Sequence, residues 1–101
     1  PENIKVTFVN GNRSFIINSD RDGHNHLYMY SLTGILQKQL TKGDFDVELI
    51  AYDEDKQLIY YSAENAIRSM DLKQKETIIK SDFYDKKLLS YSPNYYIMQY
   101  C

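Results

Sequence analysis

Short strand-like runs separated by turn residues repeat along this chain, and their spacing constrains the fold more than any other feature. The run Lys5–Val9 is followed by the turn-forming segment Asn10–Arg13 and then by a second run, Ser14–Ser19. Asn and Gly tolerate the positive φ of tight hairpin turns, so the two runs are expected to pair as a hairpin. The same alternation continues to the end of the chain.

The predicted strands fall into repeated sets of four. The first set is Lys5–Val9, Ser14–Ser19, His26–Leu32 and Leu36–Leu40, and the second is Asp44–Tyr52, Leu58–Ser62, Ala66–Leu72 and Glu76–Lys80. A third set opens with Leu88–Ser92 and Tyr95–Cys101 and stops halfway. An offset of 43 residues aligns Phe15 with Leu58 and Ser19 with Ser62, so we expect these residues to be equivalent.

A repeat of four strands in roughly 40 to 45 residues is typical of a β-propeller blade. We therefore predict an all-β fold of antiparallel β-propeller blades, about two and a half four-stranded blades of a larger propeller. The expected partial propeller domain covers residues 1–101, with one blade at 4–43, a second at 44–81 and a half blade at 86–101. A plain β-sandwich also repeats its strands about every 8 to 12 residues, and it is the competing architecture.

The composition favours strands and excludes several classes of function. The chain has 10 Tyr and no Trp, and flat or branched side chains pack well on a pleated sheet. Its net charge is −2 and its basic residues are dispersed, so nucleic-acid binding is not expected. The apolar runs are far shorter than the roughly 20 residues that cross a bilayer, so no membrane span is expected.

Pro1 in place of a start Met favours an excised piece of a longer protein. Cys101 is the single cysteine, which excludes an internal disulfide.

A series of short motifs occupies the segment Phe15–Val47. One strand ends in Ser-Asp-Arg-Asp-Gly, the next reads His-Leu-Tyr-Met-Tyr, and Gln-Leu-Thr-Lys-Gly closes the repeat. This series resembles the N-terminal β-propeller domain of the dipeptidyl peptidase IV branch of the prolyl oligopeptidase family. The matching residues are Ser19, Asp20, Arg21, Asp22, Gly23, His26, Leu27, Tyr28, Tyr30, Gln39, Leu40, Thr41, Lys42 and Gly43. Tyr91–Cys101 is similar to the opening of the family's next blade, so the resemblance covers nearly the whole chain.

Some positions depart from the family pattern. His24 stands where an aromatic residue, often Trp, is usual, and the loop Ala63–Asn65 lacks the longer insertion of the family. Arg68 and Ser69 replace the usual Leu-Tyr of their strand. These departures put the register of the second blade's outer half in question.

The resemblance implies serine hydrolysis by a separate C-terminal α/β-hydrolase domain, whose nucleophile lies on a G-x-S-x-G elbow. This chain contains no G-x-S-x-G, so we assign it no catalytic residue. The family binds the amino terminus of its peptide substrate with a Glu-Glu pair. No Glu-Glu dipeptide occurs here, so no substrate-binding residue is assigned.

The segment Asp20–His26 holds two aspartates and two histidines and therefore raises the question of a metal site. His-x-His places both imidazoles on one side only in an extended segment, and the aspartates resemble a calcium loop that lacks its later ligand positions. We interpret the segment as a hairpin loop with its turn at Asp22-Gly23. Its aspartates are expected to accept backbone N–H bonds or to pair with Arg21, and His26 to pack on a strand. No metal site and no cofactor are predicted.

Tyrosines on the predicted strands also suggest an aromatic platform for a sugar or a peptide. Tyr28 and Tyr30 share a face, whereas the adjacent Tyr60 and Tyr61 must point to opposite faces. Blade-to-blade packing uses both faces of a sheet, so we expect these rings to serve core and inter-blade packing. An acidic face, expected to be solvated, is formed by Asp44, Asp46 and Glu48.

The sequence thus leads to one main hypothesis, that this chain is a non-catalytic propeller fragment of a dipeptidyl peptidase IV-like serine exopeptidase. By resemblance, the parent removes dipeptides from peptide N-termini, with Pro or Ala second, while its propeller shapes access and binds the peptide substrate. The alternative is a non-enzymatic propeller or β-sandwich module that binds a protein or a glycan. Isolated blades leave apolar faces and strand edges uncovered, so self-association is expected. The resemblance also suggests a periplasmic or otherwise exported parent.

Overall fold

A computed structural model describes residues 5–80, 89–91 and 96–98, which form β-strands joined by turns. No helix occurs in these ranges, and hence none that could span a membrane. The first sheet has the strand order β1 (Val6–Val9), β2 (Ser14–Ser19), β3 (His26–Ser31) and β4 (Leu36–Gln39). The second has the order β5 (Val47–Asp53), β6 (Leu58–Ala63), β7 (Ala66–Asp71) and β8 (Glu76–Lys80). A short pair, β9 (Leu89–Tyr91) and β10 (Tyr96–Met98), follows.

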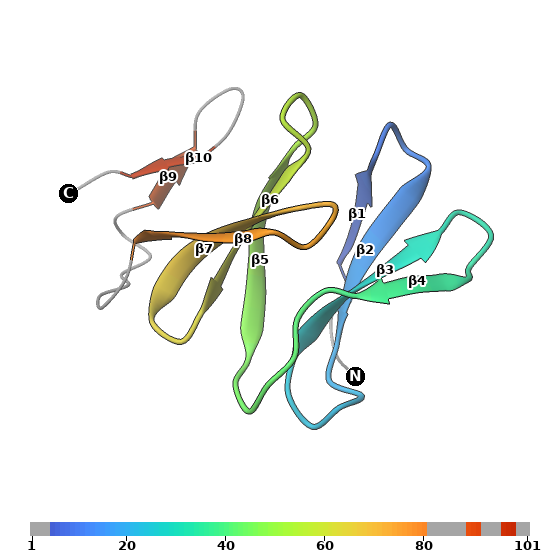
Figure 1. The fold of residues 1–101 in the computed structure, drawn as a ribbon, viewed down its shortest axis with the longest axis horizontal. Helices are drawn as coiled ribbons and strands as arrows, with labels where there is room; N and C mark the ends of the chain where they lie inside the picture. The colour runs from blue at the N-terminus through green and yellow to red at the C-terminus, as the bar shows by residue number, and fades with distance from the viewer. Residues whose placement is uncertain (1–4, 81–88, 92–95, 99–101) are drawn as a thin grey trace.

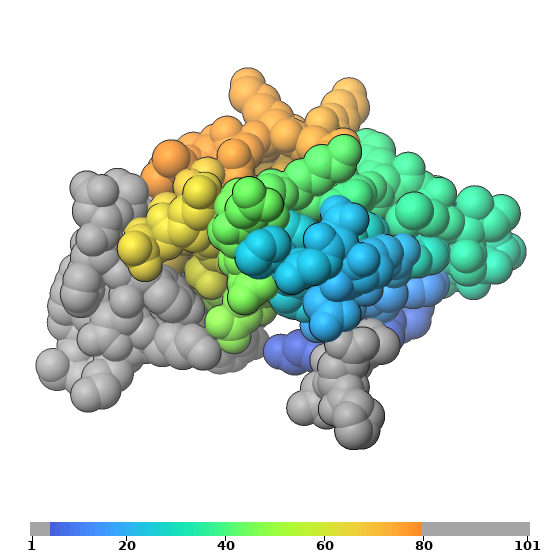
Figure 2. Space-filling view, turned by 90° about the horizontal axis from the view of Figure 1, so that it is seen from below, coloured from blue at the N-terminus to red at the C-terminus, as the bar shows by residue number. Residues whose placement is uncertain are grey.

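Each four-stranded sheet is an antiparallel meander in which every strand pairs with the next strand of the chain. We call β1–β4 blade 1 and β5–β8 blade 2. Figure 1 shows the two blades side by side, with β9 and β10 on the side of blade 2 that faces away from blade 1. In Figure 2 they form adjoining blocks, and the teal β3–β4 hairpin projects at one end. The predicted all-β fold in sets of four strands is confirmed.

The hairpin turns follow from the residues that occupy them. Gly11 and Asn12 have φ values of 62° and 64°, and the Arg13 N–H donates to the Asn10 carbonyl at 3.1 Å. Two successive positive φ angles are what a type I′ turn requires, and Gly and Asn adopt them at little cost. The Asn-Gly hairpin predicted from the sequence is therefore confirmed.

The main apolar core lies between the two blades, where one face of each sheet packs against the other. Ile16 of blade 1 and Ile59 of blade 2 are both completely buried there. The other buried members of this core are Val9, Leu27, Met29, Leu40, Val47, Tyr61, Ala63 and Met70. Tyr60 belongs instead to a smaller cluster on the opposite face of blade 2, as predicted from the alternation of neighbouring side chains.

The structure corrects the repeat offset by one residue. Ser14 and Leu58 begin β2 and β6, and the offset between them is 44 residues rather than the predicted 43. With the predicted offset, Ile16 and Ile59 would be equivalent. Equivalent residues of successive blades point in the same direction along the row of blades, whereas Ile16 and Ile59 point toward each other into the core between the blades. Because side chains alternate between the two faces of a strand, a slip of one residue exchanges the faces. Phe15 is therefore the equivalent of Ile59.

Several strand boundaries also differ from the prediction, most of them by one residue. The strand expected to begin at Asp44 begins at Val47. In blade 2 the loop after β6 is only Glu64 and Asn65, because Ala63 and Ala66 already pair across the sheet. The predicted strand ends at residues 88, 92, 95 and 99–101 lie outside the described residues.

The first hairpin turns of the two blades contact each other. The Asn10 N–H donates to the Tyr52 hydroxyl at 3.0 Å, and the Gly11 N–H donates to a Glu54 carboxylate oxygen at 2.9 Å. The Gln57 side-chain amide donates to Asn10 Oδ1 at 3.1 Å. These bonds join the blades at one end, so the relative position of the blades is set by polar contacts as well as by the apolar core.

Candidate functional site

At the other end of the blades, the β2–β3 loop of blade 1 meets the connector that leads from β4 into β5. We call this region the blade junction; it consists of Asn25, His26, Thr41, Gly43, Asp46 and Val47. It lies in the segment that carries the sequence motifs described above, and it positions the first strand of blade 2 relative to blade 1.

Asn25 is the central residue of the blade junction. Its side-chain amide donates to the Val47 carbonyl at 2.6 Å, and its own carbonyl accepts from the Val47 N–H at 2.7 Å. Its backbone N–H donates to Asp46 Oδ1 at 2.8 Å, and its Oδ1 accepts from the Asn18 amide at 3.2 Å. One loop residue thus satisfies polar groups on both blades, which fixes where β5 begins.

His26 is fully buried beneath this loop, and both of its ring nitrogens are hydrogen-bonded. Nε2 lies 2.9 Å from the Gly43 carbonyl and Nδ1 lies 2.9 Å from Thr41 Oγ1. A carbonyl can only accept, so the hydrogen-bond network assigns the proton to Nε2 and leaves Nδ1 to accept from the Thr41 hydroxyl. Thr41 Oγ1 in turn accepts from the Leu27 N–H at 3.0 Å. Both nitrogens are therefore used for structure.

Gly43 lets the connector pass close to an aromatic ring. Its φ is +135°, and a Cβ on this residue would lie inside the van der Waals contact distance of the Phe45 ring. The Phe45 ring packs edge-on against His26, with ring centroids 5.5 Å apart. A side chain at position 43 would therefore disturb the packing around His26.

The exposed part of the loop does not pair as predicted. The Asp20 carbonyl accepts from the Gly23 N–H at 2.9 Å, which confirms a turn there. Arg21 extends along the sheet instead of pairing with Asp20 or Asp22, and its guanidinium lies 4.0 Å from the centre of the Tyr28 ring and donates to the Tyr30 hydroxyl at 2.7 Å. Of the two partners expected for the aspartates, Arg21 is wrong, because its guanidinium lies over the face of the Tyr28 ring instead.

The His24 ring lies beside Asp46 at the surface of the junction, with Nδ1 and Oδ1 3.5 Å apart. The hydrogen bond from the Asn25 N–H is the main cause that lowers the pKa of Asp46 below its ordinary value, and nearby His24 adds to it.

The acidic residues Asp44, Asp46 and Glu48 are all exposed, as expected for a solvated face. Within the described ranges, no three His, Cys, Asp or Glu side chains are grouped so that they could hold a metal ion.

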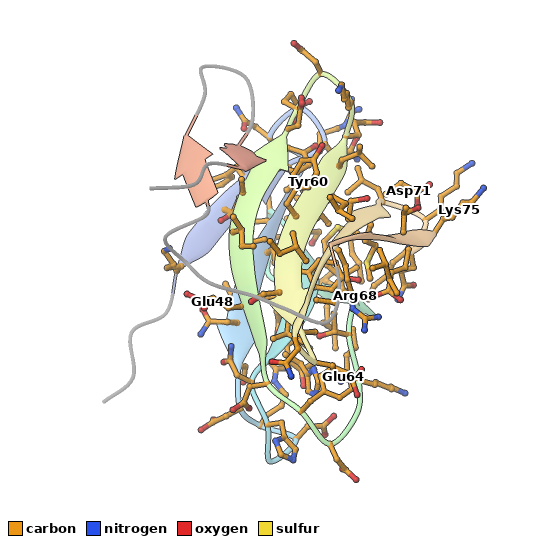
Figure 3. The ribbon with its side chains drawn as sticks, turned by 90° about the vertical axis from the view of Figure 1, so that its left-hand side faces the viewer. Glu48, Tyr60, Glu64, Arg68, Asp71 and Lys75 are labelled. Carbon is orange, nitrogen blue, oxygen red and sulfur yellow. The ribbon has the colours of Figure 1, made fainter. Side chains whose placement is uncertain are left out.

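A second polar cluster lies on blade 2 and was not predicted. Arg68 lies 3.5 Å from Glu64 and 3.4 Å from Glu76, and the Tyr61 hydroxyl donates to Glu76. In Figure 3 Arg68 and Glu64 lie toward the same end of blade 2, away from Asp71 and Lys75. Burial, and then the bond to Glu76, raises the pKa of Tyr61. The cluster neutralises a half-buried arginine beside the core.

A cavity of about 320 Å³ opens between the blades next to the junction. The polar residues Lys5, Asn18, Asn25 and Glu48 line it together with the apolar residues Ile16, Ile17, Leu27 and Leu49. The Lys5 N–H donates to Asn18 Oδ1 at 3.2 Å, so part of the wall is ordered by hydrogen bonds. The cavity is therefore lined by both polar and apolar residues.

Comparison with known proteins now identifies the family. Residues 2–100 match the family described as the Dipeptidyl peptidase IV (DPP IV) N-terminal region. The chain belongs to this family. Its fold is similar to the crystal structure of Porphyromonas gingivalis dipeptidyl peptidase 4, with a TM-score of 0.69 and 26% sequence identity. The match covers 91% of this chain and 14% of that one, so the chain spans a small part of its solved relative.

Membership of the dipeptidyl peptidase IV family confirms that blades 1 and 2 are β-propeller blades.

The corrected register explains the departure from the family's pattern at Arg68. Tyr28 and Arg68 are equivalent, because each lies opposite the fourth residue of the second strand, Ile17 in blade 1 and Tyr61 in blade 2. Arg68 therefore stands where blade 1 has a tyrosine, and the acidic residues around it compensate. The sequence signal for this cluster was an arginine close to two glutamates, Glu64 and Glu76. Only the correct register shows that these side chains lie together beside Tyr61.

Proposed function

We propose that this chain is a non-catalytic part of the propeller of a longer serine exopeptidase that removes dipeptides from peptide N-termini, with Pro or Ala second. The observation that carries the proposal is the family match over residues 2–100. The similar fold of a dipeptidyl peptidase 4, of which this chain spans 14%, supports it. In this proposal, catalysis belongs to a C-terminal α/β-hydrolase domain of the same parent chain.

The chemistry of the described residues supports a structural and gating role. The buried His26 uses both ring nitrogens in hydrogen bonds, so it is not available as a general base. The sequence carries no G-x-S-x-G elbow that could expose a nucleophilic serine. The propeller therefore serves the parent by shaping the path of the peptide.

The cavity beside the junction is the part of this path that we assign to the chain. It lies between blade 1, where residues of β2 and β3 line it, and the first strand of blade 2, and the blades of a propeller surround a central channel. Amide groups such as those of Asn18 and the ammonium of Lys5 can bond to the backbone and side chains of an extended peptide. Short substrates that do not reach the channel would not use these contacts.

The test is made on the parent protein, expressed from its complete reading frame. We expect it to hydrolyse Ala-Pro-p-nitroanilide and to be inactivated by a fluorophosphonate that labels a serine within G-x-S-x-G. A parent with neither property, whose reading frame ends with the propeller, would contradict the peptidase proposal and favour a propeller that binds a protein or a glycan.

The gating role has its own test in the same parent. Lys5→Met is expected to raise KM several-fold for a peptide of about ten residues and to leave the constants for Ala-Pro-p-nitroanilide unchanged. Lys73→Met, in the exposed β7–β8 turn, is the matched control and should change neither. Equal effects of Lys5→Met on the long and the short substrate would contradict a role of this cavity in guiding peptides.

A further inference from the structure

The turn between β1 and β2 contains an Asn-Gly dipeptide, Asn10-Gly11, that contacts the β5–β6 turn of blade 2. Both turns lie at the upper end of their sheets in Figure 1. The hydrogen bonds between them reach two groups of the dipeptide that can react with each other. These groups are the Gly11 backbone nitrogen and the Asn10 side-chain amide.

The Gly11 nitrogen is held beside a proton acceptor. Its N–H donates to a Glu54 carboxylate oxygen at 2.9 Å. A carboxylate at this distance can take up the proton as the nitrogen forms a new bond, which is the role of a general base. A Cβ placed on Gly11 would meet nothing beyond the chain neighbours closer than the Arg13 guanidinium, at 4.0 Å. The nitrogen is therefore also sterically accessible.

The side-chain carbonyl of Asn10 is held by two donors. Its Oδ1 accepts from the Gln57 side-chain amide at 3.1 Å and from the Arg13 guanidinium at 3.3 Å. Donors at this oxygen stabilise the negative charge that develops on it when a nucleophile attacks the carbonyl carbon. The contact between the turns thus activates both partners of one reaction.

We propose that Asn10 is a site of spontaneous modification, at which the turn converts asparagine into aspartate and isoaspartate. The Gly11 nitrogen forms a bond to Asn10 Cγ, and its proton passes through Glu54 to Asn10 Nδ2. The bond between Cγ and Nδ2 then breaks, ammonia leaves, and a cyclic succinimide remains. Water opens this ring at either of its carbonyls, which gives the two products. The proposal does not rest on the peptidase function.

Either product weakens the contact between the blades. Each places a new carboxylate near Glu54, and the two negative charges repel each other. Isoaspartate also inserts a methylene between the N–H groups of residues 10 and 11. These groups bond to the Tyr52 hydroxyl and to Glu54, and their spacing fits both partners only in the unmodified chain. The modification therefore loosens the end at which polar contacts join the blades.

The test follows Asn10 in the parent protein, expressed from its complete reading frame and incubated at neutral pH. Mass spectrometry with fragmentation of its tryptic peptides gives the fraction of aspartate and isoaspartate at position 10. Asn12 is an internal control in the same turn, because it precedes Arg13 rather than a glycine. We expect Asn10 to convert several-fold faster than Asn12. An Asn10 that stays unchanged, or that converts no faster than Asn12, would overturn the proposal.

Two isosteric variants of the parent test the role of Glu54. Glu54→Gln keeps the shape of the side chain but cannot take up the Gly11 proton, so conversion at Asn10 should slow by about tenfold or more. Asp55→Asn removes the same charge from the neighbouring exposed residue and should leave the rate unchanged. An equal rate in wild type and in both variants would mean that the dipeptide reacts without Glu54, and the proposed reaction would be wrong.

Asn10→Asp imitates one product and tests its effect on the blades. Hydrogen exchange of the parent should become faster at residues 53–57, the turn that Asn10 and Gly11 contact, because the contact opens more often. Asn12→Asp introduces the same charge in the same turn and should leave this exchange unchanged. Equal exchange in the two variants would contradict a contact that depends on Asn10.

Discussion

Asn25 of blade 1 and Val47 of blade 2 are joined by two hydrogen bonds, one from the Asn25 side-chain amide to the Val47 carbonyl at 2.6 Å and one from the Val47 N–H to the Asn25 carbonyl at 2.7 Å. The first residue of β5 is thus paired with a loop of the preceding blade as well as with Ala63 of its own sheet. The start of blade 2 is therefore determined by a contact between blades.

Asn25→Ala should lower the free energy of unfolding by about 1 to 3 kcal/mol, because it leaves the Val47 carbonyl and the Asn18 amide without their side-chain partner. Urea denaturation at a fixed protein concentration measures the change. Asn12→Gly is the matched control, because Asn12 is exposed at a positive φ that glycine also adopts. Equal losses in the two variants would show that the Asn25 side chain does not join the blades.

Gly43→Ala should destabilise the protein by about 2 to 5 kcal/mol, because the new methyl group meets the Phe45 ring and the backbone keeps a positive φ. Gly34→Ala shares the positive φ but has open space around the added Cβ, so it should cost only about 1 to 2 kcal/mol. Thermal and urea unfolding of both variants check the difference. If the two substitutions cost the same, the close approach of Phe45 to Gly43 is not present in solution.

Asp46 should stabilise the folded chain at neutral pH and lose this effect in acid. Its pKa is lowered below 3.8, mainly by the hydrogen bond from the Asn25 N–H, so the folded state binds a proton less readily than the unfolded state. The stabilisation is complete above the unfolded value and is lost as pH falls through the folded-state pKa. The difference in free energy of unfolding between wild type and Asp46→Asn should therefore shrink below about pH 4. Asp55→Asn, in an exposed turn, serves as control, and a pH-independent difference at Asp46 would refute the assignment.

Tyr61 should give the opposite pH dependence. Burial and then the bond to Glu76 raise its pKa above 10.0, so the folded state holds its proton at a pH where the unfolded state releases it. Its contribution is complete below the unfolded value and is lost as pH rises toward the folded-state pKa. The stability advantage of wild type over Tyr61→Phe, measured by urea denaturation, should decrease from about pH 10 upward. An advantage that stays constant to about pH 11.5 would contradict a buried, protonated Tyr61.

Much of the architecture could be predicted because the local signals agree with the final structure. The Asn-Gly turn after Val9, the alternation around Tyr28 and Tyr30 and the short loop after Ala63 each specify a hairpin within a few residues. The repeat offset could not be read as reliably. Phe15, Ile16 and Ile17 are all apolar, so composition alone does not show which of them faces the next blade.

The junction was predicted only in part, because its partners are distant in the sequence. The motif residues His26, Thr41 and Gly43 were recognised, and the segment was interpreted as a loop, but the hydrogen bonds among them span 15 and 17 residues. Nothing local distinguishes a histidine that binds a metal from one that bonds to a threonine and a carbonyl. Whether His26 could bind a metal was therefore decided by the positions of Thr41 and the Gly43 carbonyl, which occupy both of its ring nitrogens.

The sequence by itself determined the strands, their turns, the fold class and the family, because these depend on neighbouring residues and on motifs that neighbouring residues form. Only the tertiary structure decided which face of each blade is covered, why Arg21 lies on tyrosine rings, and how Asn25 joins the blades. The physical reason is that burial and hydrogen bonding are properties of pairs brought together by packing. A side chain such as Ile16 has the same chemistry whether a second sheet covers it or not, and only the packed blades show that its face is buried.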